Sequence, residues 1–176
     1  MKLGEHEMKS NQSVADEIRK YMNYIYLILF AGITMWYYLY STVLEYKYPY
    51  ALYLGLRYAL MAYVLVSIAL VVWQKQYSTV LEPVFMVLIL VSAGVVTYVV
   101  KDNAVFDFAL LLVGAKNVPW KRIAYVYLCI AVVIQGIAYY ASTTGIIADI
   151  TMQADRGVRH SLGIIYPTDM AAHMLF

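Results

Sequence analysis

The stretch ALYLGLRYALMAYVLVSIALVVW, residues 51–73, decides the fold. It contains one charged side chain, Arg57, and no proline. The hydrocarbon core of a bilayer is about 30 Å thick and needs roughly 20 helical residues to cross it. In lipid, backbone polar groups must pair within the segment, as they do in a helix. The sequence therefore predicts a transmembrane helix over residues 51–73.

The rest of the chain has the composition of a membrane protein. Of its 176 residues, 63% are hydrophobic and 14% are charged, against about 25% charged residues in an ordinary soluble domain. Mean hydropathy is +0.65. The net charge of +2 is too small to indicate a nucleic-acid partner. The single cysteine, Cys129, excludes an intramolecular disulfide.

Further apolar segments flank this helix on both sides. They lie at residues 24–44, 83–100, 104–115 and 123–148. All except the segment at 104–115 are long enough to cross a bilayer, the one at 83–100 marginally. The short segment either extends over 102–118 or re-enters the face it came from. We expect the extension, because the charges on either side require a crossing.

These segments predict an all-α, polytopic membrane protein with about five transmembrane helices. Residues 1–23 form a polar lead of mixed charge without the apolar core of a signal peptide, and we expect a short amphipathic helix at about 14–21. The membrane domain covers 24–148, and 149–176 follow it. With the N-terminus in the cytoplasm, eight lysines and arginines lie inside and four outside. This bias favours a cytoplasmic N-terminus and an extracytoplasmic C-terminal segment.

Two charged residues fall inside the predicted spans, where charge is costly and commonly functional. Arg57 either snorkels to the outer lipid headgroups or faces an outward cavity and holds an anionic headgroup. Asp107 either helps to cap a helix that begins near Asp102 or Asn103, or it pairs with Arg57 or Lys101 across the helix bundle.

The segment DRGVRHSLG, residues 155–163, concentrates cationic chemistry. On a helix, Arg156, Arg159 and His160 would share one face. Two adjacent guanidinium groups suit a pyrophosphate, because each offers planar bidentate donors. A neighbouring histidine is able to take a proton from an attacking hydroxyl near neutral pH. The alternative is a juxtamembrane loop whose basic residues contact lipid phosphates.

The last segment, YPTDMAAHMLF (residues 166–176), offers further polar groups. Tyr166 is an aromatic platform, and Asp169 lies near the positive N-terminus of an expected helix. His173 follows Asp169 by four residues. We expect residues 149–176 to form an outer-face loop followed by the first turns of a sixth helix.

Residues 155–176, DRGVRHSLGIIYPTDMAAHMLF, resemble a segment of the bacterial O-antigen, capsular and exopolysaccharide polymerases. FDFALLLVGAKNVPWKRI, residues 106–123, resembles their upstream segment. The resemblance implies an enzyme of the bacterial plasma membrane that joins oligosaccharide repeat units at the outer face. Its substrate is a glycan linked to polyprenyl pyrophosphate, and its partners are the lipid bilayer and other glycan-assembly membrane proteins.

The resemblance also assigns roles to individual residues. It implies catalytic roles for His160, Arg159 and Arg156. It implies substrate binding by Arg57, Tyr166, Asp169 and His173. No metal or other cofactor is required if arginines supply the positive charge.

The chain departs from that family in length. Such polymerases usually have ten or more spans and a sizeable later loop, so we expect an N-terminal portion or a truncated copy. The alternative is a non-enzymatic membrane protein, either a transporter or flippase fragment or an accessory subunit of glycan export.

Overall fold

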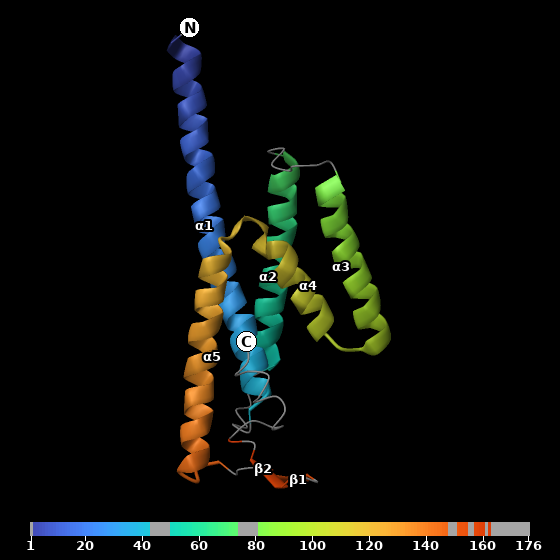
Figure 1. The fold of residues 1–176 in the computed structure, drawn as a ribbon. Coiled ribbons are helices and arrows are strands. Elements are labelled where there is room, and N and C mark those ends of the chain that lie inside the picture. The colour runs from blue at the N-terminus through green and yellow to red at the C-terminus, as the bar shows by residue number, and fades with distance from the viewer. Residues whose placement is uncertain are drawn as a thin grey trace. The chain divides into compact units, whose positions relative to one another are not determined.

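The computed structural model describes residues 2–42, 50–73, 81–147, 151–154, 157–160 and 162. Within these ranges, side chains are described from Glu17 onward, except at 152–160. The helices are α1 (Lys2–Tyr40), α2 (Tyr50–Trp73), α3 (Leu81–Val100), α4 (Ala104–Gly114) and α5 (Trp120–Thr143), with the 3-10 turn η1 (Ala115–Asn117) before α5 (Figure 1). A short antiparallel hairpin follows, formed by β1 (Thr151–Ala154) and β2 (Gly157–His160).

The chain is a helical, polytopic membrane protein, which confirms the predicted fold class. Among the described residues, four helices are long and apolar enough to cross a membrane, namely Glu17–Tyr40 of α1, α2, α3 and α5. Large apolar side chains cover the outside of these helices, where a soluble protein would carry polar groups. Such an apolar surface is suited to contact with lipid.

Helix α1 is longer than expected. Residues 14–21, predicted as a short helix, are helical and lie within α1, which runs continuously from Lys2 to Tyr40 over 39 residues. The helix passes through residue 23, the predicted end of the polar lead, without interruption.

Helix α5 is shorter than expected. It ends at Thr143, whereas the apolar segment was predicted to continue to about residue 148. Gly145 adopts a φ of 74°, and two backbone bonds close the end: Gly145 N–H donates to Ser142 O, and Ile146 N–H donates to Ala141 O. This is a Schellman motif, in which a left-handed glycine ends the helix.

The chain divides into two compact units, and each is described by itself. One consists of Met1–Phe30 and Gly55–Ile123, and the other of Ala31–Leu54 and Ala124–Phe176. In the second unit, Tyr38 packs with Ala131 and Ile134 of α5. The Tyr38 and Tyr127 hydroxyls are 2.8 Å apart. These contacts join the C-terminal part of α1 to α5.

In the first unit, α4 runs back along α3. The two helices are joined by a short turn and pack against each other (Figure 1). Phe106 of α4 lies over Gly94, whereas Lys116 of η1 pairs with Glu82 at the beginning of α3, with Nζ 2.8 Å from Oε1. Helix α4 and η1 therefore follow α3 in the antiparallel direction.

The segment predicted to extend over 102–118 is helical from Ala104 to Asn117, as α4 followed by η1. Helix α4 has 11 residues, which gives a length of about 16 Å. The α-helix ends at Gly114, and η1 adds only three residues, or about 6 Å. Their combined length is well below the roughly 30 Å that a lone helix must cross, so contacts with other helices must stabilise this segment.

Candidate functional site

The candidate site is an ion pair within the membrane-spanning part of the first unit. Arg57 Nε of α2 lies 2.9 Å from Asp107 Oδ1 of α4. The Nε–H bond is not aligned for a hydrogen bond with that oxygen, so the contact is an ion pair by distance. The Asp107 side chain is 0% exposed and that of Arg57 is 15% exposed. A buried charge of this kind is stable only when it is paired.

Phe106 completes the surroundings of the arginine. Its ring centroid lies 5.6 Å from Arg57 Cζ, which is within cation–π distance. Phe106 and Asp107 are neighbours on α4, so one short helix supplies both an aromatic face and a carboxylate. These two contacts hold the guanidinium group two turns into α2, below the helix end.

The beginning of α4 explains how Asp107 comes to lie there. The backbone N–H of Ala104 donates to Asp102 Oδ1 at 2.9 Å, so Asp102 satisfies an open donor of the first turn. Asp107 also lies in the first turn of α4, where the helix dipole favours a carboxylate. Of the two predicted roles for Asp107, pairing with Arg57 is confirmed, and the capping contact belongs to Asp102.

Two tyrosines hold the other end of α4. The Tyr26 hydroxyl donates to Leu111 O at 2.8 Å, and the Tyr63 hydroxyl lies 3.5 Å from Gly114 O. A Cβ added at Gly114 would lie 3.0 Å from the Tyr26 ring and 3.3 Å from the Tyr63 ring. Leu111 O also accepts the backbone N–H of Ala115, so the Tyr26 hydroxyl is a second donor to that carbonyl. The two tyrosines therefore fix the end of α4 by packing around Gly114 and by donating to its carbonyls from outside the helix.

Sequence reasoning missed this tyrosine clamp, which we define as Tyr26, Tyr63 and Gly114. Tyrosines near a membrane are usually assigned to the interface with water. The available signal was position, because Tyr63 lies mid-way along a predicted span. A glycine directly after a short apolar run was a second signal, since it allows the close approach of aromatic rings.

The tail residues are largely outside the described part of the chain. Arg156, Tyr166, Asp169 and His173 belong to that group. Arg159 and His160 lie in β2, where they pair in register with Met152 and Thr151.

The expectation that Arg156, Arg159 and His160 share one face held only if the segment were a helix. Residues 157–160 form a strand instead, so Arg159 and His160 do not share a helical face, and Arg156 lies outside the described residues. The spacing argument for adjacent guanidinium groups does not apply to this geometry. The chemical assignment of these residues stays a prediction.

The described residues contain no group of three or more histidine, cysteine, aspartate or glutamate side chains placed to hold a metal ion. Comparisons with protein-family models, curated proteins and solved structures find no match to this chain.

Proposed function

We propose that the chain is the membrane portion of a bacterial polymerase. It joins oligosaccharide repeat units carried on polyprenyl pyrophosphate at the outer face of the plasma membrane. The observation that supports a functional site in the membrane is the Arg57–Asp107 pair. An intramembrane charge that is held by both a carboxylate and an aromatic ring is costly to maintain, and such residues commonly mark substrate sites.

The proposed reaction is a glycosyl transfer. An acceptor hydroxyl oxygen forms a bond to the anomeric carbon of the growing glycan, and the bond from that carbon to the pyrophosphate oxygen breaks. Polyprenyl pyrophosphate leaves, and His160 takes the hydroxyl proton. Arg156 and Arg159 neutralise the charge that develops on the leaving group. Arg57 is a further candidate for contact with an anionic headgroup, with Tyr166, Asp169 and His173 contributing to substrate binding.

The proposal includes an orientation. With the N-terminus in the cytoplasm, the excess of lysine and arginine lies inside. Arg57 is then near the outer end of α2, and residues 149–176 are outside. Lys116 and Glu82, paired at the beginning of α3, are then near the inner face.

A second candidate function is non-enzymatic, as a transporter, flippase fragment or accessory subunit of glycan export. One observation favours it. Asp107 is a fully buried carboxylate on a short helix within the membrane domain, and transporters place charged groups near discontinuous helices. On this alternative the basic residues of 155–163 contact lipid phosphates only.

Replacing Arg159 separates the two candidates. In the bacterium that encodes the chain, Arg159→Ala is introduced at the chromosomal locus, and the length distribution of the glycan is measured by gel electrophoresis. We expect long polymer to be lost while single repeat units remain. Lys101→Ala is the matched control, because it removes an exposed cation at the end of α3. An unchanged length distribution, at equal protein abundance, would overturn the polymerase proposal.

A further inference from the structure

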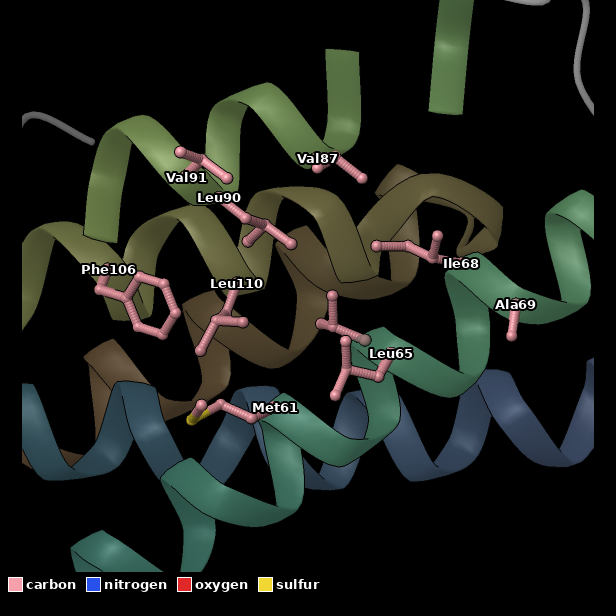
Figure 2. A pocket seen from close by; sticks show the side chains of 10 residues that line it. Met61, Leu65, Ile68, Ala69, Val87, Leu90, Val91, Phe106 and Leu110 are labelled. Atoms are coloured by element: carbon pink, nitrogen blue, oxygen red, sulfur yellow. The ribbon is translucent and has the colours of Figure 1, made fainter. Parts of the chain in front are cut away.

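An apolar groove lies between three helices of the first unit. Its volume is about 460 Å³, within the range of roughly 300–1,000 Å³ typical of ligand sites. Figure 2 shows side chains of α2, α3 and α4 that face the shared space, among them Met61, Leu65, Leu90, Phe106 and Leu110. All the lining side chains are apolar. The groove therefore fits a hydrocarbon chain.

A cation lies at one end of this groove. Phe106 lines the groove, and Arg57 Cζ lies 5.6 Å from the centroid of the Phe106 ring. Arg57 contacts Asp107 through Nε, and its side chain is 15% exposed. A guanidinium group has five N–H donors in a planar fork, so its two terminal nitrogens remain suited to a phosphate. The apolar groove is suited to the hydrocarbon chain of a lipid, and the cation is suited to an anionic headgroup.

We infer that the groove holds an acyl chain of an anionic phospholipid whose phosphate contacts Arg57. The bilayer around the chain supplies this lipid at high concentration. A peptide segment fits less well, because its backbone N–H and C=O groups would face a lining that offers no polar partner. The inference goes beyond the proposed polymerase function and does not depend on it. It assigns Arg57 to a bound phospholipid and leaves the pyrophosphate to Arg156 and Arg159.

The test measures lipid retained by the purified full chain in native mass spectrometry. The probes are phosphatidylglycerol, whose phosphate is anionic, and diacylglycerol with the same acyl chains, which lacks a phosphate. We expect phosphatidylglycerol to be retained roughly tenfold more strongly, the size expected for one charge-assisted hydrogen bond. The double variant Arg57→Leu with Asp107→Leu removes the charge pair as a unit, and it should abolish this preference. Equal retention of both lipids by the wild type would overturn the inference.

A matched pair of variants on α3 tests the groove itself. Leu90→Trp places a large ring among the lining residues, whereas Leu88→Trp adds the same ring to a side chain that is 60% exposed and outside the groove. We expect Leu90→Trp alone to lose lipid retention, with helicity unchanged by circular dichroism. Equal retention by the two variants would contradict the inference.

Competition identifies the occupant. Polyprenyl phosphate is added to the complex with phosphatidylglycerol. Displacement of phosphatidylglycerol at equal or lower concentration would overturn the assignment to a phospholipid and give the groove to the glycan carrier. Resistance to displacement supports the assignment. None of these measurements depends on polymer length, so the inference and the proposed function fail independently.

Discussion

Helices α3 and α4 are neighbours in sequence and in space, yet they are stabilised by different surroundings. Helix α3 has 20 residues, of which only Ala93 is buried. Helix α4 has 11 residues, and five of them are buried, including Asp107 and Gly114. A full-length apolar helix can face lipid on nearly all sides. A helix too short to cross must have its charge paired and its end contacted by other parts of the protein.

The largest effect on stability is expected when the carboxylate of α4 is removed. Asp107→Leu leaves Arg57 without its carboxylate inside the membrane domain. We expect a loss of about 3–5 kcal/mol in the free energy of unfolding, because an uncompensated buried charge is costly. The measurement is unfolding in mixed detergent and SDS micelles, followed by circular dichroism.

The control for Asp107→Leu is a double variant. Adding Arg57→Leu removes the remaining charge, and we expect most of the lost stability to return, since apolar replacements of a whole pair are often neutral. A double variant no more stable than Asp107→Leu would show that the ion pair is not what joins α4 to α2. A leucine introduced on α3 at an exposed position outside the groove, Val95→Leu, should have little effect.

The second test compares a glycine in each helix. Gly114→Ala places a Cβ 3.0 Å from the Tyr26 ring, and we expect a loss of about 1–2 kcal/mol from overpacking. Gly94→Ala meets Phe106 at an ordinary 3.7 Å, and the higher helix propensity of alanine should add up to about 1 kcal/mol. Unfolding of the two variants in the same micelles should therefore shift in opposite directions. A shift of the same sign in both would contradict the difference between α3 and α4.

The sequence predicted α2 and α3 closely, because their apolar runs are long enough to decide the structure alone. It did not predict what stabilises the end of α4. The hydrogen bond from Tyr26 to Leu111 joins residues 85 positions apart. Hydropathy along a single segment carries no information about such a partner. The end of α5 was predicted about five residues too late, at 148 rather than Thr143, although Gly145 is a recognisable stop signal.

The candidate site was predicted in part. The pairing of Arg57 with Asp107 was one of the alternatives, because two opposite charges in apolar spans need compensation. The aromatic contact from Phe106 was not predicted, since nothing in the sequence relates its ring to the second span. The helical face for Arg159 and His160 was wrong, because a spacing of three and four residues predicts proximity only where a helix forms.

The third test removes one hydroxyl of the tyrosine clamp. Tyr26→Phe keeps the ring against Gly114 but loses the hydrogen bond to Leu111 O. Hydrogen bonds within membrane domains contribute on average about 0.6 kcal/mol and at most about 1.7 kcal/mol, so we expect a loss in that range. Tyr98→Phe on α3 is the control, because that side chain is 84% exposed. Equal unfolding of both variants would mean that the carbonyl needs no partner from Tyr26.

The smallest effect is expected in the turn that joins the two helices. Lys101 adopts a φ of 58°, a left-handed conformation that costs a residue with a Cβ about 1–2 kcal/mol. Lys101→Gly relieves this strain but gives the unfolded chain more freedom. We expect a net gain of about 0.5–1 kcal/mol in the free energy of unfolding.

Lys101→Ala is the control. It removes the same charge and keeps the Cβ, so its stability in the same unfolding assay should stay close to that of the wild type. A gain in Lys101→Ala equal to that in Lys101→Gly would assign the effect to the lysine charge. The turn at Lys101 would then be unstrained. The contacts of α4 with Arg57 and the tyrosine clamp would alone explain why α4 differs from α3.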